Sequence, residues 1–188
     1  MIKNNFYIIS GGPGVGKTTL INALRRIGFT TVEEEARRII KDQLATGGDG
    51  VPWKNKTLYA QLMFDASVSA YEEIKKSVDF REPVYFDRGI LDAVCYMHME
   101  NIPVSKETVD TVHKCVYNRN VFILPPWREI YETDSERKQS WKEALSTFDR
   151  MKETYLEYGY HVIEVPKVSV LERQRFIVEK TKIRSPRS

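Results

Sequence analysis

Short apolar runs alternate along the chain with longer stretches whose apolar residues recur at helical spacing. The runs suit buried strands and cover residues 6–9, 29–32, 84–86, 121–124 and 160–163. Helices are predicted over residues 19–27, 33–40, 54–76, 91–100, 105–117, 141–158 and 170–180. Strands separated in this way by helices predict a parallel sheet with right-handed crossovers.

The two longest predicted helices have distinct apolar faces. The first is expected to present Leu58, Leu62, Ala66, Ala70 and Ile74, which recur every four residues. The second is expected to present Trp141, Leu145, Phe148, Met151, Tyr155 and Tyr158. Both helices are therefore predicted to pack on one side and to meet water on the other.

A glycine-rich segment, GGPGVGKTT, lies between the first strand and the first helix. It matches G-x-x-x-x-G-K-[ST], in which glycines bring backbone N–H groups close to phosphate oxygens and the helix start adds further donors. Lys17 can reach the β- and γ-phosphates, and the Thr18 hydroxyl can ligate magnesium. A chance glycine turn is disfavoured, because a strand precedes the segment and a helix follows it. The predicted ATP-binding residues are Gly11, Gly12, Pro13, Gly14, Val15, Gly16, Lys17, Thr18 and Thr19.

These elements predict a three-layer α/β P-loop NTPase fold, with a five-stranded parallel sheet of order 2-3-1-4-5 and helices on both faces. Ligands of such sheets bind at the carboxyl ends of the strands. With 188 residues, the chain is predicted to be one P-loop domain over residues 1–180, followed by a basic tail at 181–188. A lid segment is predicted at about residues 127–140.

Composition and charge narrow the class of protein. A net charge of +3 is too small to indicate nucleic acid, so no such partner is expected. Cys95 and Cys115 lack metal-ligand spacing and are interpreted as reduced thiols of a cytoplasmic protein. No apolar run approaches the ~18 residues of a membrane span, and the N-terminus lacks a signal-peptide pattern. The oligomeric state is left open.

Charged residues follow the second and third predicted strands. Asp87 is positioned as a second magnesium-side carboxylate, and Arg88 stands where a hydrolytic motor usually has a glutamate. Arg88 therefore favours contact with a phosphate or a second substrate, the alternative being a strand-end salt bridge. One of Glu33, Glu34 and Glu35, with Glu34 as first choice, is a candidate general base. Capping by Thr31-x-x-Glu34 and i,i+4 pairs with Arg37 and Arg38 are the structural alternatives.

Further candidates lie around the expected nucleotide and acceptor. Arg137, with Arg128 and Lys138, could close on phosphates, or could simply form a solvated face. Lys167 and Val168 could pack against the donor base, and Gln61 could pair with an acceptor base, although core packing is the commoner fate of residues in the helix that holds Gln61. The three histidines are assigned no role.

Together these residues resemble a known group. The chain resembles the AAA-like "predicted ATPase" branch of P-loop proteins. The residues that carry the resemblance are the segment 11–18, Glu34 with Arg37, Asp87-Arg88-Gly89 with Asp92 and Tyr96, Pro125-Pro126-Trp127, and Asp134 with Arg137. That branch is similar to the nicotinamide riboside kinase domain and, more distantly, to deoxynucleoside and thymidylate kinases. The resemblance implies that Glu34 acts as base and that Arg37 and Arg88 contact substrate.

Two functions remain as hypotheses. The first is a kinase that uses ATP and Mg²⁺ to phosphorylate a small acceptor of nucleoside or nucleotide type, with Lys17, Glu34, Asp87, Arg88 and Arg137 as catalytic residues. The second is a nucleotide-controlled, ATPase- or GTPase-like switch with little transfer activity. A nucleic-acid motor is disfavoured by Arg88 and by the lack of a long basic face.

Overall fold

Five short strands alternate with helices in the protein, described here as a computed structural model over residues 5–77, 82–130 and 140–181. The strands are β1 (Phe6–Gly11), β2 (Thr30–Val32), β3 (Val84–Asp87), β4 (Asn120–Leu124) and β5 (His161–Glu164). The helices are α1 (Lys17–Arg26), α2 (Glu35–Thr46), α3 (Lys56–Ser77), α4 (Ile90–Met99), α5 (Lys106–Lys114), α6 (Trp141–Glu157) and α7 (Val170–Thr181), with a 3₁₀ turn, η1 (Arg128–Ile130). The predicted alternation of strands and helices is confirmed.

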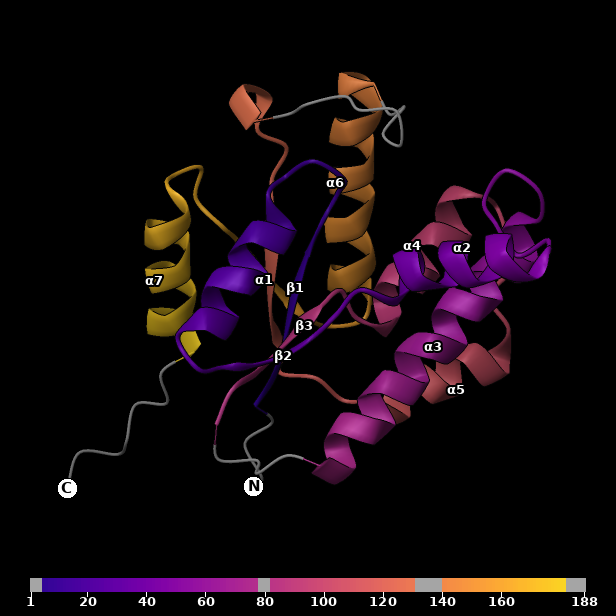
Figure 1. The fold of residues 1–188 in the computed structure, drawn as a ribbon, viewed down its shortest axis with the longest axis horizontal. Helices are drawn as coiled ribbons and strands as arrows, with labels where there is room; N and C mark the ends of the chain where they lie inside the picture. Colours follow the sequence, from indigo (N-terminus) through magenta and orange to yellow (C-terminus); the bar gives the residue numbers. More distant parts are fainter. Residues whose placement is uncertain (1–4, 78–81, 131–139, 182–188) are drawn as a thin grey trace.

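The strands form one parallel sheet in the order β2-β3-β1-β4-β5, as predicted. β1 is central and pairs with β3 and β4, with Ile9 opposite Asp87 and Gly11 opposite Leu124. This register brings the ends of all three strands to one edge of the sheet. In Figure 1 the turn from β1 into α1 lies at that edge, with η1 and the start of α6 nearby.

Alternate residues of β1 face two separate hydrophobic cores. Phe6 and Ile8 belong to a core shared with α3, α4 and α6, whereas Tyr7 and Ile9 belong to a second core shared with α1 and α7. Figure 1 shows the corresponding layers, with α1 and α7 on one side of the sheet and α3, α4, α5 and α6 on the other. The predicted three-layer arrangement is confirmed.

Two predicted helix faces need correction. In α3 the buried residues are Tyr59, Ala60, Phe64 and Tyr71, whereas Leu58 of the expected stripe is 39% exposed. The reason is that α3 contacts both α2 and α4, so its buried surface is wider than one narrow stripe. In α6, Phe148, Met151 and Tyr155 are buried as predicted, but Leu145 is 43% exposed. Among the described residues, no helix combines the length and apolar character required to cross a membrane.

Candidate active site

The loop between β1 and α1 has the geometry that phosphate binding requires. Gly14 and Gly16 adopt left-handed conformations, with φ of 76° and 79°. Gly16 directly precedes α1, and no side chain caps the helix, so the first N–H groups of α1 remain available. The positive φ of Gly16 favours glycine at this position, and a Cβ there would also lie 3.0 Å from Nη1 of Arg173. Thr18 and Thr19 are exposed at the start of the helix.

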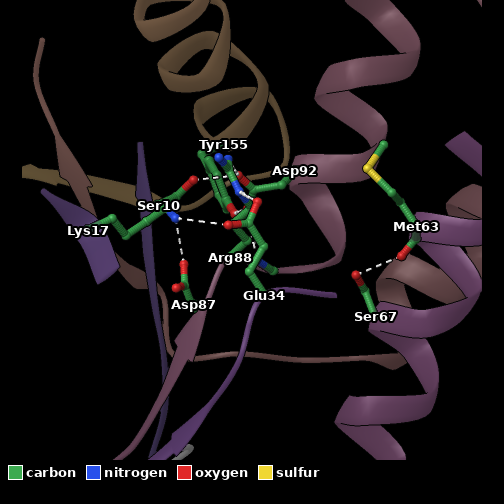
Figure 2. Close-up of polar contacts among 10 residues, drawn as sticks. Ser10, Lys17, Glu34, Met63, Ser67, Asp87, Arg88, Asp92 and Tyr155 are labelled. Carbon is green, nitrogen blue, oxygen red and sulfur yellow. Dashed lines mark hydrogen bonds and ion pairs between the residues drawn. The ribbon is translucent and has the colours of Figure 1, made fainter. Parts of the chain in front are cut away.

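Lys17 joins two carboxylates that the sequence separates widely. Its Nζ lies 2.7 Å from Oδ1 of Asp87 and 3.5 Å from Oε2 of Glu34. The lysine is 6% exposed and Asp87 is 8% exposed, so the pair is largely removed from water. Figure 2 shows the three side chains converging from α1, the end of β3 and the segment after β2. With Arg88, which bonds to Glu34, the structure brings together four of the five predicted catalytic residues.

Arg88 closes this cluster on the opposite side of Glu34. Its Nε donates to Oε1 of Glu34 at 2.6 Å, and its Nη1 donates to Oδ1 of Asp92 at 3.2 Å. The Arg88 backbone is left-handed, with φ of 72°, an uncommon conformation for a residue with a side chain. Its N–H donates to the carbonyl of Ile9 at 3.0 Å, which fixes the backbone against β1.

Asp92 anchors the arginine from the first turn of α4. Its Oδ2 accepts hydrogen bonds from the backbone N–H of Gly89 at 2.8 Å and from the hydroxyl of Tyr155 at 2.5 Å. The Ser10 hydroxyl donates to Oδ1. Asp92 therefore links β1, α4 and α6 at the point where Arg88 enters the site (Figure 2).

Burial and charge change the acidity of the two central carboxyls in opposite directions. Burial alone would raise the pKa of Glu34, but Arg88 and Lys17 outweigh it and lower that pKa to about 2. Burial raises the pKa of Asp87, and Lys17 offsets only part of this effect. Burial would lower the pKa of Arg88, but Glu34 and Asp92 raise it above its ordinary value, so the guanidinium stays charged. Glu34 is consequently a weak base in the free protein.

A cavity of about 430 Å³ opens beside this cluster. Its lining includes Gly12 and Pro13 of the phosphate loop, together with Glu34, Asp87 and Arg88. The opposite side is formed by α3 and α4, including Tyr59 and Tyr96, whose rings meet edge to face at 5.4 Å. The cavity thus extends from the phosphate loop to an aromatic surface. Its volume suits a small ligand.

The structural alternatives for the glutamates after β2 are not realised. Glu34 precedes the first residue of α2 and makes no capping hydrogen bond with its side chain. Glu33 pairs with Arg25 at 3.0 Å, and Glu35 pairs with Arg38 at 2.5 Å. Of the three, Glu34 is the carboxylate that reaches the Lys17 and Arg88 cations.

Several predicted binding residues lie away from the cavity. Gln61 is exposed on α3, donates to Asp65 at 2.9 Å and does not line the cavity, so its role as a substrate contact stays a prediction. Arg37 is exposed and does not line the cavity, although its charge contributes to lowering the pKa of Glu34. Arg128 in η1 lies 5.6 Å from the ring centre of Trp141.

The predicted donor-base residues follow β5. Lys167 is exposed beside a second hollow of about 360 Å³ that Pro125, Pro126 and Phe148 also line. Val168 is half-buried, and its N–H donates to the carbonyl of Pro166 at 3.0 Å. Arg137 and Lys138, the central residues of the predicted lid, lie outside the described residues.

Sequence reasoning missed part of the supporting structure. Ser10 and Tyr155 were not singled out as site residues, and neither has a sequence signal that pairs it with Asp92. Asp92 was named only as part of the resemblance; its contact with Arg88 could have been predicted, because Gly89-x-x-Asp92 is a capping-box spacing and Arg88 lies four residues before it. Arg173 of α7 donates to the Val15 carbonyl at 3.3 Å, a contact 158 residues apart in the chain.

The donor set at the phosphate loop fits magnesium. Mg²⁺ prefers hard oxygen ligands and usually keeps several waters, binding through one or two carboxylates and substrate phosphates. The exposed Thr18 hydroxyl and the Asp87 carboxylate are such ligands. Within the described residues there is no cluster of three or more His, Cys, Asp or Glu side chains arranged for a metal ion. A Mg²⁺ ion here would therefore depend on nucleotide phosphates.

The sheet order, the glycine loop and the buried lysine–carboxylate cluster define a P-loop NTPase of kinase-like fold. A model of the family described as an AAA domain matches residues 6–173, and the chain belongs to this family. No curated protein sequence matches the chain.

Solved structures with the same fold include several kinases. The NadR protein in complex with NR has a TM-score of 0.71 and 18% identity, and the match covers 99% of this chain and 53% of NadR. This chain therefore spans about half the length of NadR. A deoxyadenosine kinase from M. mycoides has a TM-score of 0.56 and 17% identity, covering 93% of this chain and 97% of that one. Thymidylate kinase from Candida albicans has a TM-score of 0.60 and 12% identity, covering 95% and 91%.

Proposed function

We propose that the protein is a Mg²⁺- and ATP-dependent kinase that phosphorylates a small acceptor of nucleoside or nucleotide type. The observation that carries the proposal is the convergence of Lys17, Asp87, Glu34 and Arg88 where the phosphate loop meets the cavity. A donor phosphate and an acceptor hydroxyl would meet at such a junction. The kinases among the structural neighbours support the same class of reaction.

On the donor side, loop N–H groups and the start of α1 bind phosphates, and Lys17 leaves the carboxylates to contact the β- and γ-phosphates. Thr18 and Asp87 would hold Mg²⁺, which neutralises charge on the phosphates. On the acceptor side, Glu34 accepts a hydrogen bond from the attacking hydroxyl and orients it. Because the pKa of Glu34 is lowered to about 2, orientation is favoured over full proton removal. Phosphoryl transfer demands little base strength.

Arg88 supports transfer in two ways. Its guanidinium holds Glu34 in place, and its position beside the acceptor keeps positive charge near the transferred group. A charged arginine here, in place of a carboxylate that activates water, also disfavours hydrolysis. The predicted lid at 127–140, with Arg137, would add positive charge around the transferred phosphate. The cytoplasmic location remains a prediction from cysteine usage.

The direct test is to incubate the protein with Mg²⁺, ATP and a panel of nucleosides, nucleotides and related metabolites, and to detect phosphorylated product by mass spectrometry. Lys17→Ala is expected to lower turnover by roughly 100-fold or more, because it removes a charge that stabilises the transferred phosphate. Lys75→Ala is the matched control, because Lys75 is exposed on α3 and pairs with Glu72.

Near-normal turnover by a folded Lys17→Ala variant would refute the proposed role of the loop. Nucleotide binding without product from any acceptor would favour the switch function instead. Circular dichroism of each variant separates a loss of chemistry from a loss of folding.

A further inference from the structure

The cavity beside the active site has two chemically different ends. One end contains the phosphate loop and the charged cluster, and the other is formed by Tyr59 and Met63 of α3 with Tyr96 and Met99 of α4. We call these four residues the acceptor wall. Figure 2 shows Met63 on α3, set apart from the cluster of Glu34 and Arg88. A ligand with a polar end and a flat apolar end would fit this division.

No cation lining the described part of the cavity is free to hold a phosphate on the acceptor. Arg88 is the one lining cation there, and it is already bonded to Glu34 at 2.6 Å and Asp92 at 3.2 Å. Lys17 lies between Asp87 and Glu34 and is needed by the donor phosphates. Lys17 and Arg88 thus face three carboxylates, which leaves the cluster with an excess of negative charge.

The remaining lining carboxylates are paired with cations outside the cavity. These pairs are Glu33 with Arg25 at 3.0 Å, Glu35 with Arg38 at 2.5 Å and Glu100 with Lys56 at 2.5 Å. An acceptor that already carried a phosphate dianion would therefore have to displace a carboxylate or lie against one. Removing a phosphate from water without a cationic partner is strongly unfavourable.

The acceptor wall carries one unsatisfied polar atom. The Tyr96 hydroxyl is buried and has no hydrogen-bond partner among the described residues. Burial raises the pKa of both wall phenols, that of Tyr59 to about 12, so each stays neutral and keeps its proton. A neutral phenol can donate to or accept from the polar edge of a heterocycle, and the ring pair supplies apolar faces beside it.

We infer that the acceptor is an unphosphorylated compound, neutral or cationic, whose planar heterocycle binds the acceptor wall, which means a nucleoside rather than a nucleotide. This inference rests on the proposed kinase function, since it names the substrate class of that site. It follows from the commitment of Arg88 to two carboxylates and from the buried, unpartnered hydroxyl of Tyr96.

The test compares matched acceptors by calorimetry on the full chain, with Mg²⁺ and a non-hydrolysable ATP analogue occupying the donor site. The probes are adenosine, guanosine, cytidine, uridine and thymidine, each against its own 5′-monophosphate. At least one nucleoside is expected to bind 10-fold or more tightly than its monophosphate. A monophosphate that binds as tightly as its nucleoside, or an absence of binding by every nucleoside, overturns the inference.

Turnover with ATP, measured in parallel, separates this inference from the kinase proposal. A nucleoside that binds but is never phosphorylated upholds the substrate class and refutes the kinase. A monophosphate that binds preferentially and is converted to the diphosphate upholds the kinase and refutes the substrate class. Arg37→Ala adds a check, because weaker monophosphate binding in that variant would show that this exposed arginine supplies the missing cation.

Tyr96→Phe tests the acceptor wall directly. Loss of one hydrogen bond should weaken binding of the preferred nucleoside roughly 3- to 10-fold and leave affinity for the ATP analogue unchanged. Thermal stability should not fall, because the hydroxyl has no partner in the free protein. Tyr71→Phe is the control, since its hydroxyl donates to the Val116 carbonyl at 3.1 Å, outside the cavity lining. Unchanged nucleoside affinity in Tyr96→Phe would contradict the inference that the acceptor binds the acceptor wall.

Discussion

At the scale of single residues, the backbone of Arg88 adopts a left-handed conformation that positions its side chain for two ion pairs. A non-glycine residue in the left-handed region stores strain of order 1 kcal/mol, which the surrounding contacts must overcome. Here the backbone N–H bonds to Ile9, and the side chain bonds to Glu34 and Asp92. The left-handed backbone at Arg88 therefore directs its guanidinium toward Glu34 and Asp92, beside the cavity.

The ion pairs of Glu34 predict a specific dependence of stability on pH. Its pKa falls from 4.5 to about 2 on folding, so the stabilisation is complete above pH 4.5 and is lost as the pH falls toward 2. A shift of this size corresponds to about 3 kcal/mol at neutral pH. In Glu34→Gln this contribution is absent. Urea unfolding at pH 6 and pH 3 should show a stability difference between wild type and variant that shrinks at the lower pH.

A difference that stays constant between these pH values would contradict the ion pairing of Glu34. Asp87 acts in the opposite direction, because burial raises its pKa and its charged form costs stability. The comparison of wild type with Glu34→Gln is therefore more informative than either curve alone.

Sequence spacing predicted the phosphate loop fully and the rest of the site in part. Gly11, Gly16, Lys17 and Thr18 belong to one short motif, because a single loop between β1 and α1 carries all four residues. Glu34 and Arg88 are 54 residues apart, so their hydrogen bond depends on neighbouring strands, and the sequence placed both at one sheet edge without pairing them. Gln61 lies outside the cavity lining, because helical position alone does not decide which side of α3 faces a ligand.

At the scale of elements, Asp92 fastens α4 and α6 to the central strand. Tyr155 contributes from α6, where its buried hydroxyl donates to the carboxylate at 2.5 Å. Hydrogen bonds to charged groups contribute about 1.5–3 kcal/mol. Tyr155→Phe is therefore expected to lower the free energy of unfolding by about that amount in urea titrations, and to reduce turnover because Asp92 holds Arg88.

Tyr158→Phe provides the matched control for that prediction. Tyr158 follows α6 directly and is half-buried. Its ring lies 6.1 Å from that of His113, and phenylalanine keeps this ring, so a change within about 0.5 kcal/mol is expected. If the two variants lose equal stability, the Asp92 link is not what holds α6 in place.

Helix and strand positions were predictable because the apolar runs and periodic stretches are well separated by Gly and Pro. The buried surface of α3 was not, since periodicity within one helix does not reveal that α2 and α4 pack on it from two directions. The exposure of Leu145 has the same origin, because packing partners lie elsewhere in the chain.

At the scale of the whole molecule, nucleotide binding should stabilise the fold. Ligand binding to the native state alone adds about 2.7 kcal/mol at a concentration 100 times the Kd. ATP with Mg²⁺ is expected to raise the Tm, which differential scanning fluorimetry would measure. Removing Mg²⁺ with EDTA should reduce this increase in Tm. Because Lys17 must exchange its carboxylate partners for phosphates, Lys17→Ala should abolish most of the shift. An equal shift with and without Mg²⁺ would contradict the proposed metal site.

The global topology followed from the order of elements, because right-handed crossovers leave few arrangements for a parallel sheet. The contact between Arg173 and the phosphate loop could not be predicted in this way. It links the ends of the domain through α7, and periodicity gives no sign of a buried arginine on that helix.

The two cores on opposite faces of β1 allow the two sides of the site to change independently during evolution. The phosphate loop and α1 rest on the core that contains Tyr7 and Ile9, whereas α3 and α4 rest on the other. Under the proposed function, substitutions at Tyr59, Met63 or Met99 are therefore expected to alter acceptor recognition without disturbing the core beneath the phosphate loop. A directed-evolution library confined to these three positions would retain ATP binding across most of its members while diverging in acceptor choice.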